Sequence, residues 1–140
     1  MMTKRKLLAG LCAALATGLG ACGTTPERKA LSPEDAAALK EIWAGKRWEG
    51  SWGGSCTGNV EVLDIEDNIA RVRYEWGICG NSAGGYAIDD NAVLSARELK
   101  VSLSFGAKAD YVLQPDGSLV GNYSNRQGGE GNGRFLPVEP

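Results

Sequence analysis

The fold is decided by residues 60–76, which read VEVLDIEDNIARVRYEW. Apolar and polar residues alternate on both sides of Asp67-Asn68, a pattern typical of two strands joined by a two-residue turn. This turn opposes Ile65 to Ala70, Leu63 to Val72 and Glu61 to Tyr74 on one face. On the other face it opposes Asp64 to Arg71, and this pairing of opposite charges favours the register. We therefore expect an antiparallel hairpin here.

A second hairpin is predicted around Pro115-Asp116-Gly117. Pro suits the second position of a type I turn, and Gly suits the left-handed position that follows it. This turn opposes Leu113 to Leu119 and Tyr111 to Gly121, with Tyr123 further along the same face.

Short alternating runs separated by Gly, Asn and Asp continue along the rest of the chain, and Asp89-Asp90-Asn91 is interpreted as a turn between two of them. Sequential strands without crossover helices favour a barrel that closes on itself and leaves no exposed edge. The predicted fold class is all-β, a small antiparallel up-and-down β-barrel of about eight strands with one N-terminal helix. The runs lie near residues 47–53, 58–65, 69–76, 84–89, 91–95, 98–105, 109–114, 118–124 and 132–137.

The helix is expected over residues 32–45, ahead of the strands. Ser32 suits the N-cap, Pro33 suits the first turn, and the acidic residues that follow favour the positive end of the helix dipole. Gly45 is expected to end the helix. The length of 140 residues supports one domain, and we place the barrel domain at residues 46–140.

Residues 1–21 are predicted to be an export signal, because a basic start precedes an apolar run too short to span a bilayer comfortably. The run ends Leu19-Gly20-Ala21-Cys22, which resembles the bacterial lipobox. The resemblance implies that Cys22 is acylated on its sulfur and becomes the first residue of the mature chain, with residues 22–31 as a tether. An ordinary cleaved signal with a Cys nearby is the alternative.

Gly23, rather than Asp, follows Cys22. Among lipoproteins of Gram-negative bacteria this implies the outer membrane, with the domain in the periplasm or at the cell surface. Acyl chains such as palmitate contribute about 0.8 kcal/mol per buried methylene, so the membrane is an expected partner. Removal of the leader's three basic residues leaves 12 basic and 17 acidic residues, a net charge of −5. We therefore expect no nucleic-acid partner.

Two of the four cysteines remain for the folded domain, because Cys12 leaves with the leader and Cys22 carries lipid. Cys56 and Cys79 are expected to form a disulfide in an oxidising compartment, and the register of the first hairpin opposes them directly. Such a bridge stabilises a fold by roughly 3 kcal/mol in the chain-entropy model. A metal site is the alternative, which two cysteines without His support poorly.

The complete absence of His excludes catalysis by Ser-His-Asp or Cys-His and proton transfer through imidazole. No spacing of carboxylates indicates the facing pair that glycoside hydrolysis needs. Asp64, Glu66, Asp67 and Asn68 follow a hairpin tip rather than a twelve-residue calcium loop. We therefore expect a protein that is not an enzyme and that carries no metal and no cofactor.

Residues 48–52 read WEGSW, and their Gly50-Ser51-Trp52 resembles the Gly-x-Trp signature of the lipocalins, in which the Trp closes the bottom of the barrel. Residues 109–111 are similar to the Thr-Asp-Tyr motif of that family, and the resemblance implies that Arg134 packs on Trp52. Residues 46–124 also resemble small bacterial lipoproteins with a reduced lipocalin-like (calycin-type) barrel. They share a Trp-Gly-rich first strand, a Tyr-x-Trp-Gly segment at residues 74–77 and an Asp-Gly hairpin.

A barrel of eight strands has either a filled interior or room for one small ligand. Gly121, opposite Tyr111, is expected to leave space beside the ring. The aromatic candidates could instead pack in the core. Glu61 could bond a ligand or the Tyr74 hydroxyl, and the alternative is that it lies at the rim of the barrel in contact with solvent. The candidate ligand-binding residues are Trp52, Glu61, Tyr74, Trp76, Tyr111 and Tyr123.

Two functions are consistent with these features. The favoured one is a non-catalytic binding module for a small apolar or amphipathic ligand, anchored to the outer membrane. The alternative is a protein-interaction or inhibitor lipoprotein that acts through its loops near residues 81–86 and 128–133. Residues 81–86 are similar to the Ser-Gly-containing loop of bacterial lysozyme inhibitors, although the Ser-Gly pair itself is not present and no inhibitory residue is assigned. Inhibitors of secreted metalloproteases are also small exported barrels with one disulfide.

Overall fold

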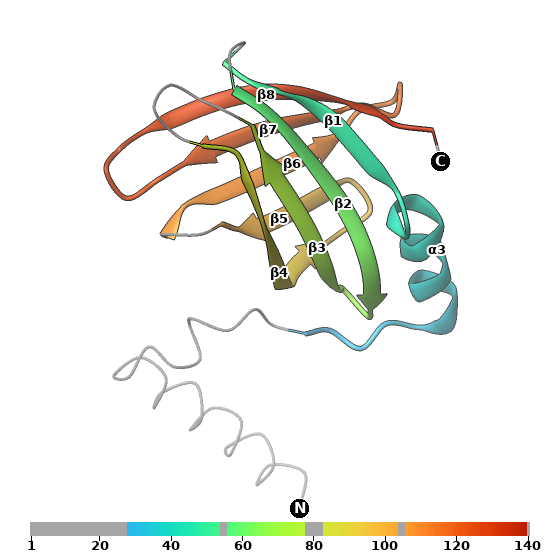
Figure 1. The fold of residues 1–140 in the computed structure, drawn as a ribbon. Coiled ribbons are helices and arrows are strands. Elements are labelled where there is room, and N and C mark those ends of the chain that lie inside the picture. Colours follow the sequence, from blue (N-terminus) through green and yellow to red (C-terminus); the bar gives the residue numbers. More distant parts are fainter. Residues whose placement is uncertain (1–27, 54–55, 78–82, 104–105, 140) are drawn as a thin grey trace, which may run out of the picture.

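The computed structural model describes residues 28–53, 56–77, 83–103 and 106–139. Eight antiparallel strands follow one another round a closed barrel in sequence order, and β8 pairs with β1 to complete the ring (Figure 1). The predicted fold class is therefore confirmed, and the architecture is consistent with a lipocalin-like fold. The strands are β1 (Arg47–Trp52), β2 (Cys56–Glu66), β3 (Ile69–Trp76), β4 (Gly85–Leu94), β5 (Glu98–Ser102), β6 (Lys108–Leu113), β7 (Leu119–Ser124) and β8 (Glu130–Pro137).

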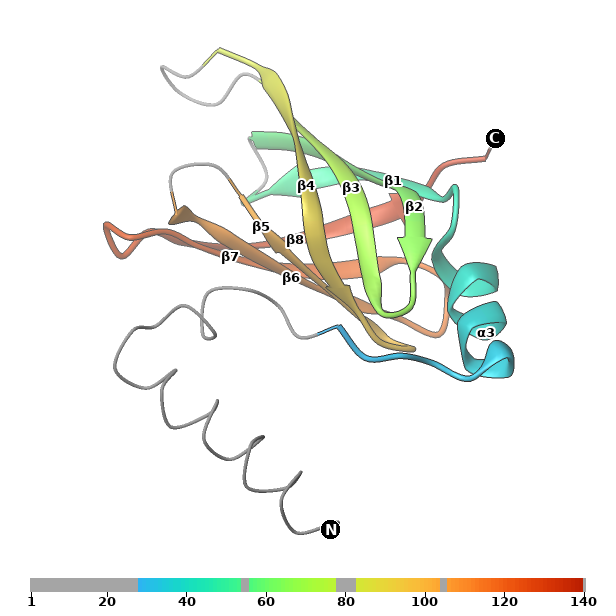
Figure 2. The same ribbon diagram turned by 90° about the horizontal axis from the view of Figure 1, so that it is seen from below.

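The predicted helix is α3 (Pro33–Trp43), which lies at one end of the barrel (Figures 1 and 2). It begins as the sequence predicts, because the Ser32 Oγ accepts a hydrogen bond from the backbone N–H of Asp35 at 3.2 Å. Gly45 has a φ of +70° and turns the chain from the helix into β1.

Two tryptophans close the end of the barrel at which α3 lies. The rings of Trp43, from α3, and Trp48, from β1, are buried with their centroids 5.6 Å apart. The indole nitrogen of Trp43 donates to the carbonyl of Ser95, and that of Trp48 donates to the carbonyl of Gly117, both at 2.9 Å. Both buried donors are therefore satisfied by loops of the same end. We call it the plugged end.

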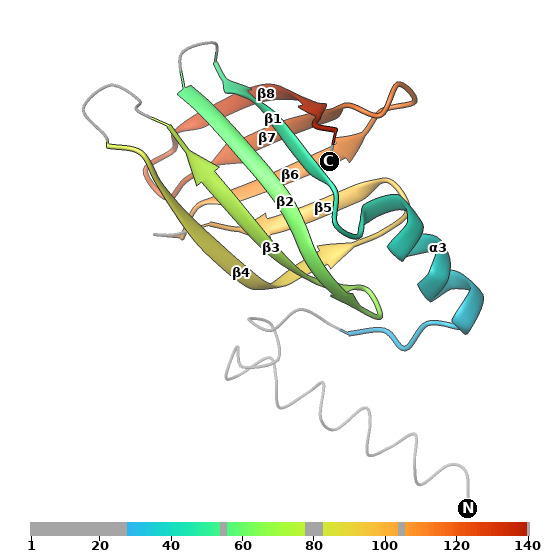
Figure 3. The ribbon, with the colours of Figure 1, turned by 45° about the vertical axis from the view of Figure 1, so that its right-hand side comes forward.

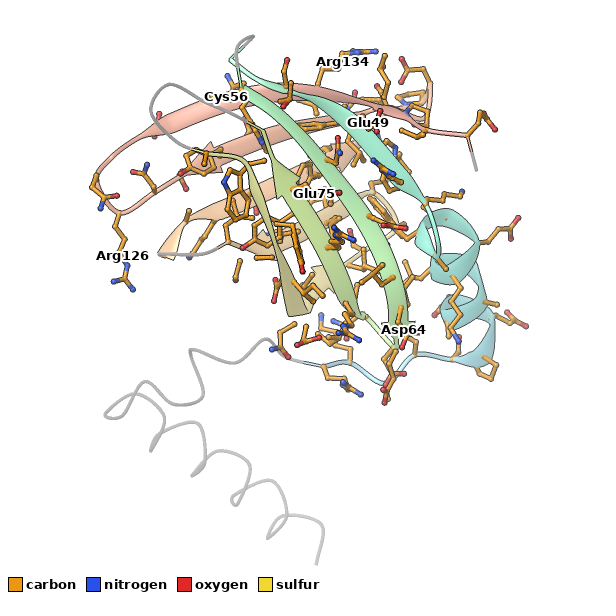
Figure 4. The ribbon with its side chains drawn as sticks, viewed as in Figure 1. Glu49, Cys56, Asp64, Glu75, Arg126 and Arg134 are labelled. Atoms are coloured by element: carbon orange, nitrogen blue, oxygen red, sulfur yellow. The ribbon has the colours of Figure 1, made fainter. Side chains whose placement is uncertain are left out.

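The opposite end carries the β1–β2, β3–β4, β5–β6 and β7–β8 connections, and we call it the mouth. Figure 3 shows β1 to β4 as the wall nearer the viewer and β5 to β8 as the wall behind. Figure 4 places Asp64 and Cys56 near opposite ends of β2, with Cys56 at the mouth. The long strands β2 to β4 therefore connect the plugged end to the mouth.

The first hairpin has its predicted turn but keeps its predicted register only near that turn. Ile65 opposes Ala70 and Asp64 opposes Arg71, as expected. A bulge at Leu63 then shifts the pairing, so that Val62 rather than Leu63 opposes Val72. Leu63 is accordingly 41% exposed. Because successive side chains point to opposite faces, this one shift reverses the predicted facing of the rest of β2.

Asp89-Asp90-Asn91 does not form the predicted turn but lies within β4. The strand runs through these residues with a bulge, so two predicted short strands are one. The Asp89 carboxylate accepts hydrogen bonds from the backbone N–H groups of Asn91 at 2.9 Å and of Ser102 at 2.8 Å. Backbone pairing with β5 covers only the last two residues of β4. The carboxylate therefore joins β4 to β5 beyond the point at which their backbone pairing ends.

The second hairpin is confirmed: Leu113 opposes Leu119, Tyr111 opposes Gly121, and Gly117 has a φ of +88°. Asp116 stabilises the turn, because its Oδ1 accepts from the hydroxyl of Ser118 at 2.6 Å and from the backbone N–H of Ser118 at 2.9 Å. These hydrogen bonds, with the neighbouring guanidinium of Arg134, hold the pKa of Asp116 below its ordinary value.

The tip of the first hairpin holds the chain that precedes α3. The Asn68 Oδ1 accepts from the backbone N–H of Lys29 at 2.7 Å, and Arg28 forms an ion pair with Glu66. Asp67 accepts from the backbone N–H of Leu31 at 3.3 Å. The polar residues of this tip therefore position residues 28–31 at the plugged end.

Candidate functional site at the mouth of the barrel

The tryptophans that face inward at the mouth are less buried than the two tryptophans of the plugged end. Trp48, Leu99 and Leu119 are almost completely buried. Five apolar or aromatic side chains that face inward near the mouth are only half-buried, although the barrel is closed around them. Solvent therefore reaches these side chains at the mouth. We call these residues the mouth site: Trp52, Trp76, Ala87, Leu103 and Tyr123.

Trp52 occupies the side of the interior formed by β1, β2, β7 and β8. Its ring centroid lies 4.9 Å from that of Phe135, 5.8 Å from that of Tyr111 and 5.9 Å from that of Tyr123. Gly121 makes this packing possible, because a Cβ at that position would lie 2.7 Å from the Cη2 of Trp52. The space expected beside Tyr111 at Gly121 is therefore filled by the ring of Trp52.

Trp76 covers the side formed by β3 and β4. Its ring lies over Gly85, where a Cβ would be 2.7 Å from its Cζ2, and its centroid is 5.9 Å from that of Tyr74. Its indole nitrogen donates to the carbonyl of Ala83 at 3.2 Å. Small residues, among them Ala87 on β4 and Ala109 on β6, face inward on the wall beyond it. Aromatic rings and small side chains thus form the interior surface of the mouth.

Tyr74 and Tyr111 are more deeply buried than the mouth site. Burial, and secondarily the neighbouring Tyr74, raise the pKa of Tyr111 well above its ordinary value. Tyr111 therefore stays neutral at physiological pH and brings a hydroxyl but no charge to the interior. An apolar wall with a few neutral polar groups suits an uncharged apolar or amphipathic molecule.

Glu61 does not face the interior, which corrects the sequence-based prediction. The bulge at Leu63 places Glu61 on the outer surface, between Arg47 of β1 and Arg73 of β3 in the register. Val62, its neighbour along β2, faces inward instead and is fully buried. Glu61 therefore does not share a face with Tyr74.

Trp52 and Arg134 do not lie where the resemblance to lipocalins implies. Trp48 closes the plugged end, and Trp52, which was expected to do so, lies nearer the mouth. Arg134 opposes Ser51 in the register and therefore faces outward (Figure 4). There it forms an ion pair with Asp116 at 2.6 Å. It does not pack on Trp52, because the two side chains are on opposite faces of the sheet.

Cys56 begins β2, whereas Cys79 and Cys22 lie outside the described residues. Cys56 is disulfide-bonded. Its pairing with Cys79 and the lipid anchor at Cys22 stay predictions. Direct opposition of Cys56 to Cys79 followed from a hairpin without a bulge, and the observed pairing of Gly58 with Trp76 removes that geometric support. The expectation from an oxidising compartment is unaffected.

Comparisons with protein families, curated proteins and solved structures find no match to this chain. Among the residues that the structure describes, no helix is both long and apolar enough to cross a membrane. In the same part of the chain, no three His, Cys, Asp or Glu residues gather to form a metal site. The function is therefore inferred from the side chains of the barrel itself.

Substitution of Gly121 by Ala is expected to destabilise the fold by about 1–3 kcal/mol, because the added methyl group overlaps the ring of Trp52. Gly131→Ala is the matched control, since Gly131 faces inward on β8 and nothing lies within 4 Å of its added Cβ. Urea denaturation followed by tryptophan fluorescence measures both free energies of unfolding. Equal values for the two variants would contradict the packing of Trp52 against Gly121.

Proposed function

We propose that the protein is an outer-membrane lipoprotein whose barrel binds a small apolar or amphipathic molecule at the mouth site, without catalysing a reaction. The observation that carries the proposal is the half-burial of inward-facing aromatic rings at one end of a barrel that is plugged at the other. An eight-stranded barrel has either a filled interior or room for one small ligand, and the half-buried rings at the mouth, together with the lipocalin-like resemblance, favour a ligand at that end.

The chemistry of the mouth site supports an apolar ligand. Covering the exposed parts of Trp52 and Trp76 removes apolar surface from water, which contributes about 25 cal/mol per Å². Both rings are already held by packing, Trp52 against Phe135 and Trp76 against Tyr74, so little side-chain freedom is lost on binding. A rigid aromatic surface of this kind favours ring systems or alkyl chains over ions.

The lipid anchor proposed at Cys22 also orients the barrel. Six positions separate Cys22 from Arg28, which pairs with Glu66 at the plugged end, and an extended chain of that length spans only about 20 Å. β2, with 11 residues, runs from the plugged end to the mouth and is roughly 36 Å long at about 3.3 Å per residue. The acyl chains would then lie within about 20 Å of Arg28, which favours an orientation with the plugged end nearer the membrane than the mouth.

A second candidate function is interaction with, or inhibition of, another protein through the outer face of β4. Tyr86 is 62% exposed and Ile88 is 40% exposed, both close to the mouth. The guanidinium of Arg73 lies 4.4 Å from the centroid of the Tyr86 ring and holds the ring on the surface. Residues 78–82, which include the start of the proposed loop, lie outside the described residues. Tyr86 is therefore the residue that favours this candidate.

Titration with N-phenyl-1-naphthylamine, a neutral fluorophore that brightens in apolar surroundings, tests the mouth site. Trp76→Ala is expected to weaken binding about fivefold to tenfold, because it removes one aromatic wall of the site. Tyr86→Ala is the matched control, because its ring is on the outer face of the neighbouring strand. Circular dichroism confirms that both variants are folded.

Two outcomes of this titration would count against the mouth site: no fluorescence increase with the wild-type protein, or an equal loss in both variants. Inhibition of lysozyme or of a secreted protease that is lost in Tyr86→Ala alone would favour the second candidate instead.

Replacement of Cys22 by Ser is expected to release the protein from membranes into the soluble fraction, because the acylated sulfur is lost. Cys12→Ser is the control, since Cys12 belongs to the predicted leader. Fractionation of cells that express each variant measures the distribution. Unchanged membrane partitioning of Cys22→Ser would refute lipidation at this residue.

A further inference from the structure

A separate concave region lies on the outside of the barrel, where β6, β7 and β8 approach the mouth. It is a hollow of about 260 Å³. Tyr123 borders it, although the ring of Tyr123 points inward toward Trp52. The other six lining residues form two rows across the three strands, and we call these six residues the polar hollow: Lys108, Ser124 and Glu130 in one row, and Asp110, Asn122 and Asn132 in the other.

The side chains of the polar hollow contribute little to the hydrogen bonding within the fold. Elsewhere, Asn68, Asp89, Asp116 and Asn125 each accept backbone N–H groups and so hold turns, a bulge or the N-terminal segment. The six side chains of the polar hollow form no hydrogen bond and no ion pair with the part of the chain that the structure describes. They stand on strands whose backbones are already paired on both sides. Their hydrogen-bonding capacity is therefore available to a ligand.

The composition of the polar hollow indicates the class of ligand. Its two amides both donate and accept, its two carboxylates accept, and its ammonium group donates. The hydroxyl groups of a sugar ring also donate and accept, so one ring can bond several of these side chains at once. One basic and two acidic residues leave the region with a net negative charge, which opposes a phosphate or another polyanion. An apolar molecule would desolvate these groups without replacing their hydrogen bonds.

We propose that the polar hollow binds an uncharged oligosaccharide through its hydroxyl groups. The volume of the hollow is below the roughly 300–1,000 Å³ typical of pockets that enclose drug-sized ligands. Its lining is mostly exposed. It therefore holds about one sugar ring of a chain that continues beyond it. This inference does not rest on the mouth site, because the polar hollow is on the opposite face of the sheet.

Isothermal titration calorimetry of the full chain in detergent, with maltotriose and with tri-N-acetylchitotriose, tests the proposal. Both trisaccharides present hydroxyl groups on neighbouring carbons, and only the second carries acetamido groups. Asn122→Ala and Asn132→Ala are each expected to weaken binding about fivefold or more, because each removes hydrogen bonds to hydroxyl groups. Asn91→Ala is the matched control: Asn91 is also an exposed strand residue, but it lies on β4, outside the polar hollow.

Binding of either trisaccharide that is weakened by the polar-hollow variants, and not by Asn91→Ala, supports the proposal. Absence of binding of both trisaccharides at millimolar concentration would overturn it. So would equal affinities of Asn122→Ala, Asn132→Ala and the wild-type protein. A loss confined to Trp76→Ala would place the sugar at the mouth site and would also refute this assignment, while N-phenyl-1-naphthylamine binding reports on the mouth site separately.

Discussion

Closure of the sheet between β1 and β8 is the constraint on which the rest of the structure depends. Once eight strands form a ring, every second side chain of each strand points into a narrow interior, and the chain has to fill that space. Large inward residues on one strand then require small ones opposite. Trp52 on β1 is accommodated because Gly121 and Gly133, on β7 and β8, carry no side chain where its ring lies.

The two ends of the barrel meet this requirement differently. At the plugged end, a helix supplies Trp43, which packs on Trp48, and the indole nitrogens of both are bonded to loop carbonyls. At the mouth no helix is present among the described residues, and Trp52 and Trp76 remain half-buried. The plugged end therefore stabilises the fold, and the mouth leaves parts of two aromatic rings exposed to solvent.

Features that depend on neighbouring residues were predictable from the sequence. Both hairpin turns, the helix cap at Ser32 and the inward facing of Trp52, Tyr74, Trp76, Tyr111 and Tyr123 follow from turn chemistry and alternation. The bulge at Leu63 was not predictable, because Val62 and Leu63 are both apolar and either suits the interior. That one residue reversed the facing of Glu61.

Burial along the barrel axis depends on contacts between distant segments. The closing role of Trp48 is not predictable from neighbouring residues, because its partner, Trp43, comes from the helix. The Gly-x-Trp resemblance predicts Trp52 for this role instead. The polar hollow is not predictable from one strand alone. Its residues come from three strands, and only their register brings Asp110, Asn122 and Asn132 into one row. Alternating polar residues on each of these strands are the signal that was present in the sequence.

The most direct test of a barrel with one plugged and one accessible end is nuclear magnetic resonance of its four tryptophan indole N–H groups, recorded with a soluble paramagnetic relaxation agent. The structure predicts strong attenuation of the Trp52 and Trp76 signals, because both rings are half-buried at the mouth. It predicts little change for Trp43 and Trp48, whose indole groups are buried and bonded to carbonyls. Equal protection of all four signals would contradict an accessible mouth.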